Sequence, residues 1–265
     1  MPMIDVPGGQ LNYRIDGTTR AGAKTLVFSN SLGTTLDMWD AQVAPFGEHF
    51  RLLRYDTRGH GASSNVNSST SFAELGEDVV RLLDHLKIGS AHFVGLSMGG
   101  MTGMWLGAHK AARIERLVLC NTAAMIGPAS LWDTRIAAAM QSGVHSLAPA
   151  VIARWFTAGF VAGNPAAVKP IESMLLVANA TGYAASCTAL RDADLRADLA
   201  HIGATTLVVA GTHDPATTVE DAKALVAAIR DARMLELDAA HLSNIEASAA
   251  FNAGVLEFLL GVRDG

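Results

Sequence analysis

The chain has 265 residues, of which 50% are hydrophobic and 17% charged, and its formal net charge at pH 7 is −5. A chain of this length can bury about three-quarters of its unfolded surface, so one α/β domain needs no disulfide or metal to fold. The acidic balance leaves no basic surface for nucleic acid. Cys120 and Cys187 lie in apolar segments without zinc-ligand spacing, which indicates buried thiols in a reducing compartment.

The amino-terminal residues show no basic region followed by an apolar run, so no secretory signal is predicted. The longest segments without a formal charge, 89–109 and 173–190, contain glycines and polar residues throughout. A membrane span needs about 20 predominantly apolar residues, and neither segment fits that pattern. We therefore expect a cytoplasmic protein with neither a membrane nor a nucleic acid as partner.

Short β-branched runs alternate with longer helical patterns along the chain. Residues 71–87 have the apolar periodicity of an amphipathic helix, with Ser71 and Glu74 at capping-box spacing and Gly89 as a stop. This alternation predicts an α/β fold with a mostly parallel sheet and helices on both faces. The expected strands are 11–15, 25–29, 51–55, 91–95, 116–120, 205–210 and 233–237.

The alternation stops between residues 124 and 200, where the sequence is rich in alanine and mostly helical in pattern. We predict a core domain made of residues 1–123 and 201–265. Residues 124–200 are then a helical cap that lies over the carboxyl edge of the sheet. It is inserted before the predicted strand 205–210, whose exit loop contains the candidate catalytic acid. The cap contains two of the four tryptophans, Trp132 and Trp155.

The strongest motif is Gly95-Leu96-Ser97-Met98-Gly99, which follows a predicted strand and precedes a predicted helix. In this context G-x-S-x-G is typical of a nucleophile elbow, a turn that lifts the serine hydroxyl above the sheet. The turn is crowded, so it requires glycine around the serine. The alternative is an ordinary strand-to-helix loop in which Ser97 caps the helix. We interpret Ser97 as a nucleophile.

A serine nucleophile needs a base, and in this motif the acid and then the histidine follow the serine along the chain. His241 comes just after the last predicted strand, at the sheet edge where Ser97 emerges. Asp214 lies in the exit loop of the preceding strand and would hold the imidazole tautomer. The strand end at 121–122 offers no carboxylate. Asp238 is the rival acid, but it lies only three residues from His241. The alternatives to catalysis are that His241 is a solvated loop residue and that Asp214 is an ordinary turn aspartate.

A tetrahedral oxyanion needs two donors, and the amide of Met98 supplies one by its position after the serine. The loop after the strand 25–29 should supply the other, with Leu32 as the candidate. The loop after the strand 51–55 is interpreted as structural, with Asp56 and Arg58 as an ion pair.

Other chemistries lack their motifs. The sequence contains no H-E-x-x-H, no Cys/His cluster and no G-x-x-x-x-G-K-[ST]. The glycines at 95–100 do not have the G-x-G-x-x-G spacing of a dinucleotide site. We therefore expect neither a metal nor a cofactor, and we also disfavour a catalytic role for His60.

Together these residues resemble the α/β-hydrolase superfamily over about residues 11–260, through the elbow, the segment 56–61, Asp214 and His241. Within it, the chain is similar to the 3-oxoadipate enol-lactonases in several longer strings. These are Ser29-Asn30-Ser31-Leu32-Gly33-Thr34, Cys120-Asn121-Thr122-Ala123-Ala124, Leu190-Arg191-Asp192-Ala193-Asp194-Leu195-Arg196, Ala210-Gly211-Thr212-His213-Asp214-Pro215 and Asp238-Ala239-Ala240-His241-Leu242-Ser243-Asn244.

The resemblance implies hydrolysis of 3-oxoadipate enol-lactone to 3-oxoadipate, a late step in bacterial catabolism of protocatechuate and catechol. It also implies a serine, an aspartate and a histidine at Ser97, Asp214 and His241, and no cofactor. The same fold could instead carry a carboxylesterase or other lactonase, or a cofactor-free perhydrolase. An alternative of a different class is a ligand receptor with negligible turnover.

The substrate implied by this resemblance carries a carboxylate, which needs a cationic or multiple-donor partner when buried. Residues 124–190 contain three basic side chains, Arg135, Arg154 and Lys169. Arg135 lies three residues after Trp132 and so on the same helix face, which makes it the candidate for binding the carboxylate. The alternatives are a surface arginine and tryptophans that only pack the cap. The substrate-binding candidates are Ser31, Trp132, Arg135 and Trp155.

Overall fold

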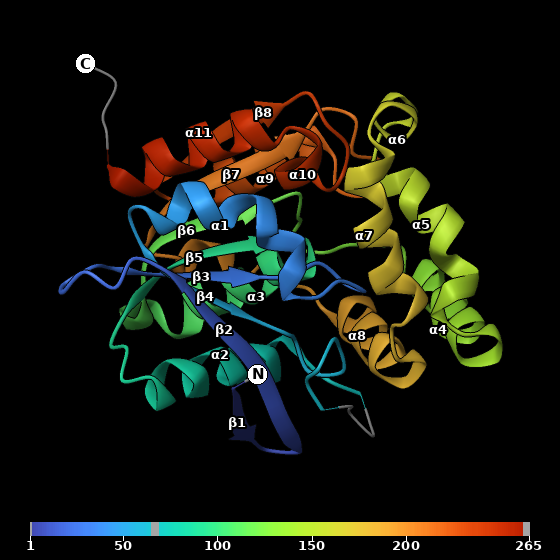
Figure 1. The fold of residues 1–265 in the computed structure, drawn as a ribbon, viewed down its shortest axis with the longest axis horizontal. Helices are drawn as coiled ribbons and strands as arrows, with labels where there is room; N and C mark the ends of the chain where they lie inside the picture. Colours follow the sequence, from blue (N-terminus) through green and yellow to red (C-terminus); the bar gives the residue numbers. More distant parts are fainter. Residues whose placement is uncertain (1, 65–68, 262–265) are drawn as a thin grey trace.

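An eight-stranded sheet runs through the centre of the molecule in the order β1-β2-β4-β3-β5-β6-β7-β8 (Figure 1). The computed structural model describes residues 2–64 and 69–261. Strand β2 pairs antiparallel with β1 and β4, and the pairings from β4 through β3 to β8 are parallel, which confirms the mostly parallel sheet. The strands are β1 (Met3–Val6), β2 (Gly9–Gly17), β3 (Thr25–Ser29), β4 (Arg51–Tyr55), β5 (Ala91–Leu96), β6 (Ile114–Cys120), β7 (Thr205–Gly211) and β8 (Ala232–Leu237).

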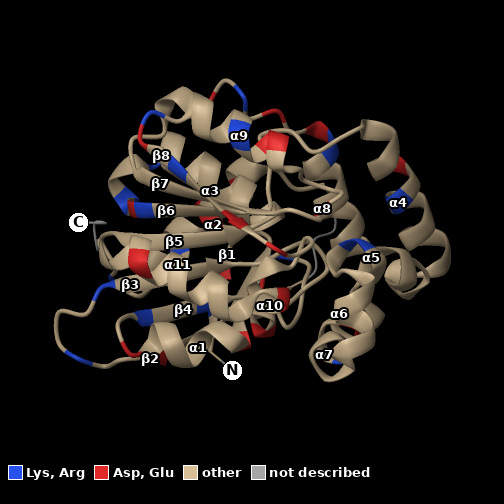
Figure 2. Ribbon diagram, turned by 90° about the horizontal axis from the view of Figure 1, so that it is seen from above, with Lys and Arg blue, Asp and Glu red and all other residues tan. Residues whose placement is uncertain are grey.

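Helices cover both faces of this sheet. All five residues of β3 are buried, as expected for a strand between two helical layers. Helices α1 and α11 lie on one face, and α2, α3 and α9 lie on the other (Figure 1 and Figure 2). The bounds of these helices are α1 (Asp40–Gly47), α2 (Phe72–His85), α3 (Met98–His109), α9 (Val219–Ala228) and α11 (Ser248–Leu260).

The amino-terminal hairpin of β1 and β2 is larger than the sequence indicated. Strand β1 was not predicted, and β2 extends beyond the expected 11–15 in both directions. The burial pattern explains the difference, because only the middle of β2 is buried and β1 has a single buried residue, Ile4. Such short and half-exposed strands carry little of the apolar signal that the central strands show.

Local chemistry predicted the start of α2 correctly but not its end. The Ser71 hydroxyl accepts the Glu74 amide at 3.2 Å, as expected for a helix N-cap. The helix ends at His85, two residues before the predicted end at 87 and four before the Gly89 stop. Lys87 takes a left-handed φ of 56°, and the Ile88 amide donates to Leu83 O at 2.8 Å. Ile88 is buried, so burying its side chain turns the chain back before the glycine is reached.

The insertion between β6 and β7 forms five helices that lie beyond the carboxyl ends of the parallel strands, at the right of Figure 1. Its last helix returns to the core at a close backbone contact, where a Cβ on Gly59 would lie 2.7 Å from the Gly182 Cα. The helices fall within the predicted cap of 124–200, and the division into two domains stays a prediction. They are α4 (Ala129–Ser142), α5 (Ala148–Trp155), α6 (Ala158–Gly163), α7 (Pro165–Leu176) and α8 (Ala180–Asp192).

The predicted ion pair between Asp56 and Arg58 is wrong. Arg58 contacts α2, where its guanidinium donates to both carboxylate oxygens of the buried Asp78 at 2.6 and 2.5 Å. Asp56 points inward and accepts from the Asn12 amide group at 2.7 Å and from the Leu36 backbone amide at 2.8 Å. Nearness in sequence did not indicate that the two side chains leave the loop in different directions.

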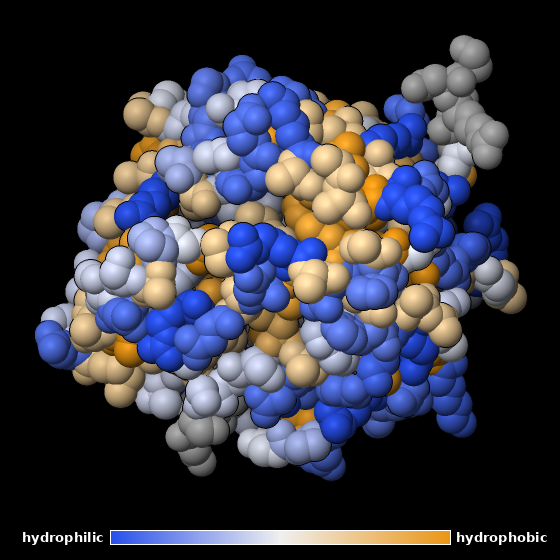
Figure 3. Space-filling view, turned by 180° about the vertical axis from the view of Figure 1, so that it is seen from behind, coloured by the Kyte–Doolittle hydropathy of each residue, from blue (hydrophilic) through white to orange (hydrophobic). Residues whose placement is uncertain are grey.

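The surface is polar with scattered apolar residues. Seen from behind, hydrophilic residues are interspersed with hydrophobic ones rather than separated into one continuous apolar face (Figure 3). Within 2–64 and 69–261, no helix combines the length and the apolar character that crossing a membrane requires. Both cysteines are buried free thiols, and burial raises the pKa of Cys187 to about 12.

His92 makes the stability of the core dependent on pH. It lies on β5, is 2% exposed, and its Nδ1 has no hydrogen-bond partner among the described residues. Burial lowers the pKa of His92 to about 4, despite the nearby Glu115 carboxylate, which raises it. Between about pH 6.5 and pH 4 the unfolded chain therefore binds more protons than the folded one, and the free energy of unfolding falls as pH falls.

We expect the free energy of unfolding to drop by roughly 1–2 kcal/mol between pH 7 and pH 5 through this histidine. Urea unfolding followed by tryptophan fluorescence at both pH values measures the drop. His92→Leu removes the titrating group and should show a smaller drop than the wild type. The buried His60, whose pKa burial also lowers, keeps part of the dependence in both proteins. A variant as sensitive to pH as the wild type would contradict this assignment.

Candidate active site

Ser97 sits in a strained turn between β5 and α3. Its φ of 56° and ψ of −113° lie in a region that side chains rarely adopt. A Cβ on Gly95 would collide with the Gly99 carbonyl, and one on Gly99 would collide with the Ser29 carbonyl. Both glycines of the motif are therefore required by close backbone contacts. The Ser97 side chain makes no cap hydrogen bond to α3, so the helix-cap alternative does not describe its hydroxyl.

Asp214 and His241 meet at the carboxyl edge of β7 and β8. The His241 Nδ1 lies 2.7 Å from Asp214 Oδ2, and both residues are buried. The other oxygen, Oδ1, accepts the backbone amides of Ala216 at 2.8 Å and Thr217 at 3.1 Å. This geometry holds Nδ1–H toward the carboxylate and leaves His241 Nε2 as the ring nitrogen that can accept a proton.

The Asp214 carboxyl is ionised across the ordinary pH range. Burial raises its pKa, but the charge of His241 and hydrogen bonds from His241, Thr217 and Asn121 outweigh burial and lower the pKa to about 2. Asp238, the rival acid, has a side chain that is 93% exposed and pairs with His213 Nε2 at 2.8 Å. The structure therefore brings Asp214, and not Asp238, to the imidazole of His241.

In the loop after β3, the Leu32 amide lies between two amides that already donate hydrogen bonds to side chains. The Ser31 amide donates to Met38 Sδ at 3.3 Å, and the Gly33 amide donates to His60 Nε2 at 2.9 Å. His60 accepts this bond as a neutral imidazole, because burial lowers its pKa. The residue disfavoured as catalytic therefore has a clear structural contact in the loop that carries Leu32.

The Met98 amide in the elbow also lies between two amides that already donate to acceptors within the protein. The Ser97 amide donates to Cys120 O at 2.9 Å, and the Gly99 amide donates to Asn30 O at 3.0 Å. Met98 is the first residue of α3, and the first amides of a helix have no acceptor within it. Leu32 and Met98 are thus the amides placed to donate to a bound oxygen, which keeps them as the candidates for the oxyanion hole.

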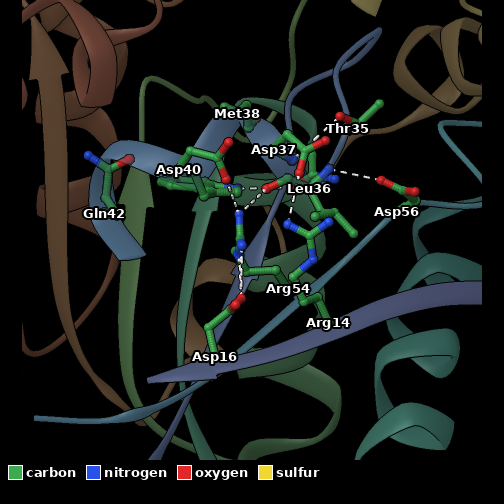
Figure 4. Close-up of polar contacts among 12 residues, drawn as sticks. Arg14, Asp16, Thr35, Leu36, Asp37, Met38, Asp40, Gln42, Arg54 and Asp56 are labelled. Atoms are coloured by element: carbon green, nitrogen blue, oxygen red, sulfur yellow. Dashed lines mark hydrogen bonds and ion pairs between the residues drawn. The ribbon is translucent and has the colours of Figure 1, made fainter. Parts of the chain in front are cut away.

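Two buried charges fix the continuation of the Leu32 loop (Figure 4). Arg54 on β4 donates to Asp16 at 2.9 Å, to Asp40 at 2.6 Å and to the Leu36 carbonyl at 3.1 Å. The amide of the same Leu36 donates to Asp56. Arg54 was not singled out from the sequence, although an arginine that directly follows Leu52 and Leu53 within a strand is a usable signal for a buried ion pair.

A cavity of about 240 Å³ opens between this edge of the sheet and the cap. Ser97 and His241 line its core side, and Arg135 and Arg154 line its cap side. The four predicted substrate-binding residues are all in the lining, together with Ser97 and His241. The third predicted catalytic residue, Asp214, is not in the lining and contacts it through His241. The lining residues are Ser31, Leu32, Ser97, Ile126, Gly127, Leu131, Trp132, Arg135, Val151, Arg154, Trp155, Tyr183, Leu190, Pro215, Ala216, Thr217 and His241.

The two arginines of the cavity carry no counter-charge within the described part of the chain. Neither Arg135 nor Arg154 forms an ion pair there, and the cavity lining contains no Asp or Glu. Burial lowers the pKa of Arg154, and the like charge of Arg135 lowers it further. The Arg135 guanidinium lies 5.1 Å from the Trp132 ring centroid, so the two share one face of α4 as predicted. Figure 2 shows how few other charges the cap helices carry.

Two family models match the sequence. One, described as the α/β hydrolase fold, matches residues 24–144, and the other, described as TAP-like protein, matches residues 177–263. The 3-oxoadipate enol-lactonase 2 of Acinetobacter baylyi is 43% identical to this chain and covers 92% of it, with 91% of its own length aligned. The chain belongs to the α/β-hydrolase family.

Solved structures support the same assignment for this hydrolase, including its helical insertion. The enol-lactonase from Burkholderia xenovorans LB400 is 47% identical, with a TM-score of 0.96 over 98% of this chain and 100% of that one. A hydrolase from Pseudomonas aeruginosa PA01 is 46% identical, with a TM-score of 0.93 over 97% of each chain. Both alignments extend through the cap, so its helices are part of the shared fold.

Polar residues around the histidine of this hydrolase were missed by the sequence interpretation. Asn121, with a left-handed φ of 44°, donates to Asp214 Oδ2 at 3.0 Å and accepts from the Ser243 hydroxyl at 2.6 Å. The sequence interpretation of this strand end concerned only the absence of a carboxylate at 121–122. Among the described residues, no group of three or more His, Cys, Asp or Glu side chains could hold a metal ion.

Proposed function

We propose that this hydrolase opens the ring of 3-oxoadipate enol-lactone to give 3-oxoadipate, in bacterial catabolism of aromatic compounds. The names of the relatives that are 43% and 41% identical support this substrate. The observation that carries the proposal is the cavity itself. It places two guanidinium groups, neither of which has an ion-pair partner among the described residues, in the same lining as Ser97 and His241, which suits an ester that also carries a carboxylate.

In the proposed acylation, His241 Nε2 takes the proton of Ser97 as its hydroxyl attacks the lactone carbonyl. The amides of Leu32 and Met98 donate to the oxyanion, and the ionised Asp214 stabilises the imidazolium. The ring then opens, and the leaving enol oxygen receives the proton from His241. An enol is a better leaving group than an alkanol, so this step needs less help from the general acid than amide cleavage would.

Because the ester is cyclic, the enol oxygen stays attached to the acyl chain after ring opening. In the proposed deacylation, a water molecule approaches the acyl ester of Ser97. His241 removes its proton as it attacks the acyl-enzyme, and the same two amides stabilise the second oxyanion. The oxyanion then collapses, its bond to Ser97 Oγ breaks, and the serine oxygen takes the proton back from His241. The released enol tautomerises to the ketone. Apart from the attacking water, the groups that act in this scheme belong to the chain.

We predict that Arg135→Ala lowers kcat/KM for the enol-lactone by roughly 10- to 100-fold, since a hydrogen bond to a charged group contributes about 1.5–3 kcal/mol. A neutral short-chain ester has no carboxylate to lose, so its kcat/KM should change by less than about 2-fold. Steady-state kinetics on both substrates measure the difference. Arg154→Ala should act in the same direction, because Arg154 lines the same cavity.

Lys169→Ala is the matched control, because this lysine is an exposed basic residue of α7 outside the cavity lining. It should leave both substrates unaffected. Equal losses on the lactone and the neutral ester in Arg135→Ala would indicate a disturbed cap rather than a lost carboxylate contact. No loss on either would exclude Arg135 from substrate binding.

A turnover assay on the enol-lactone tests the proposed function directly, with loss of the conjugated lactone chromophore as the readout. We expect sustained turnover of the lactone at a kcat/KM well above that of neutral esters. A preference for neutral esters would favour a carboxylesterase, and turnover that requires hydrogen peroxide would favour a perhydrolase. A burst followed by near-zero steady state would favour a receptor.

A further inference from the structure

The Glu246 carboxylate lies between the histidine loop and the cap. It ends the short helix α10 (Ser243–Glu246), which begins two residues after His241. Its Oε2 accepts the Ala240 backbone amide at 2.9 Å, and Ala240 directly precedes the histidine. Its Oε1 accepts the backbone amide of Thr157 at 3.1 Å and also the Thr157 hydroxyl. Thr157 belongs to the cap, between α5 and α6.

A second bond joins the same two segments on the other side of the histidine. The Leu242 amide donates to the Trp155 carbonyl, which lies at the end of α5, at 3.0 Å. The amides that flank His241 are therefore both tied to the cap, one through Glu246 and one directly. Trp155 and its neighbour Arg154 line the substrate cavity. The cavity wall and the histidine thus share one set of hydrogen bonds.

The physical character of these bonds makes Glu246 the central member. A carboxylate that accepts several N–H and O–H donors forms charge-assisted hydrogen bonds, which are stronger and more directional than neutral ones. The donors belong to two segments, Ala240 in the histidine loop and Thr157 in the cap. Losing the contact of Glu246 with one segment therefore loosens its contact with the other. A residue that only stabilised α10 would have no reason to bind the cap hydroxyl.

We propose that Glu246 is a positioning residue that couples the cap wall to His241, so that the cap sets the position of the histidine as well as the shape of the cavity. This inference rests on the proposed function for the role of His241. It predicts that a change confined to the cap side of the junction lowers kcat. A purely structural cap contact would change only KM for the anionic lactone.

The test uses variants that break the two sides of the junction separately. Glu246→Gln keeps one acceptor oxygen but replaces the other by a donor, so it cannot satisfy Ala240 and Thr157 together. Thr157→Val removes the hydroxyl donor while keeping the backbone amide and the branched shape. Thr157→Asp keeps an acceptor for the Phe160 amide, which Thr157 caps at the start of α6, but it replaces the hydroxyl donor by a second carboxylate that repels Glu246. Thr157→Ser loses only the methyl group, keeps the hydroxyl and the backbone amide, and is the control.

We expect Glu246→Gln, Thr157→Val and Thr157→Asp each to lower kcat by roughly 10- to 100-fold, on the enol-lactone and on p-nitrophenyl acetate alike. The double variant Glu246→Gln/Thr157→Val should lose no more than the worse single variant, because both changes break one device. In proton NMR, the downfield Nδ1–H signal of the His241–Asp214 pair should weaken or broaden in each. Thr157→Ser should stay within about 2-fold of the wild type.

Thermal unfolding of each variant fixes a temperature at which all are folded, and the kinetics are measured there. The proposal is overturned if the Thr157 variants raise KM for the lactone and leave kcat unchanged. It is also overturned if the two losses add in the double variant, or if the Nδ1–H signal is unaffected while kcat falls. A wild type that hydrolyses p-nitrophenyl acetate but not the lactone would reject the proposed substrate, and the kcat comparison on the neutral ester would still test the coupling.

Discussion

Ser97→Ala is expected to lower kcat on the enol-lactone by about 10⁵-fold or more, with the folded structure retained. Removal of the serine in a comparable triad costs about 10⁶, and what remains comes from the oxyanion hole and substrate binding. The loss should fall on kcat rather than KM, because the Leu32 and Met98 amides and the two cavity arginines are unchanged. Single-turnover kinetics with the lactone measure the residual rate.

The fold should tolerate this change because the Ser97 hydroxyl makes no capping bond, and alanine keeps the Cβ that the elbow already accommodates. The melting temperature should therefore stay within a few degrees of the wild type. Ser130→Ala, which changes an exposed hydroxyl on α4 outside the cavity lining, is the control and should keep most of the activity. A folded Ser97→Ala protein that retains more than a few per cent of the rate would mean that the nucleophile lies elsewhere.

The sequence was sufficient to predict which residues meet at the carboxyl edge of the sheet. Parallel strands bring their carboxyl ends to one edge, so a serine after β5, an aspartate after β7 and a histidine after β8 converge whatever the loops do in detail. The glycines of the elbow add a steric requirement that is visible in the sequence, since only glycine fits at positions 95 and 99. Local rules of this kind also predicted the start of α2 at Ser71.

The sequence was insufficient wherever a contact joins segments far apart in the chain. Glu246 binds Thr157 across 89 positions, and Asn121 binds Ser243 across 122, so no short-range spacing connects either pair. The same limit explains Arg58, whose partner is Asp78 on a helix and not its neighbour in the loop. Tertiary burial likewise decided the end of α2, because no local signal showed that the Ile88 side chain would be drawn into the core.

Asp214→Asn is expected to lower kcat by about 10⁴-fold, the loss that the same replacement causes in a serine-protease triad. The groups that surround the Asp214 carboxylate all donate hydrogen bonds to it. Oδ2 accepts from His241, Thr217 and Asn121, and Oδ1 accepts from two backbone amides, of Ala216 and Thr217. Whichever way the asparagine amide is turned, its NH₂ faces donors.

With the NH₂ toward His241, the imidazole must accept at Nδ1 and carry its proton on Nε2, where it cannot take the proton of Ser97. With the NH₂ toward the loop, the two backbone amides of Ala216 and Thr217 lose their acceptor. Asp238→Asn is the control, because its exposed side chain contacts His213 and not the His241 imidazole. Its kcat should stay within about 2-fold of the wild type. Kinetics of both variants on the enol-lactone, with thermal unfolding to confirm that they fold, decide between the two acids. If Asp238→Asn costs more than Asp214→Asn, the acid is Asp238, and the assignment of the strand end after β7 is wrong.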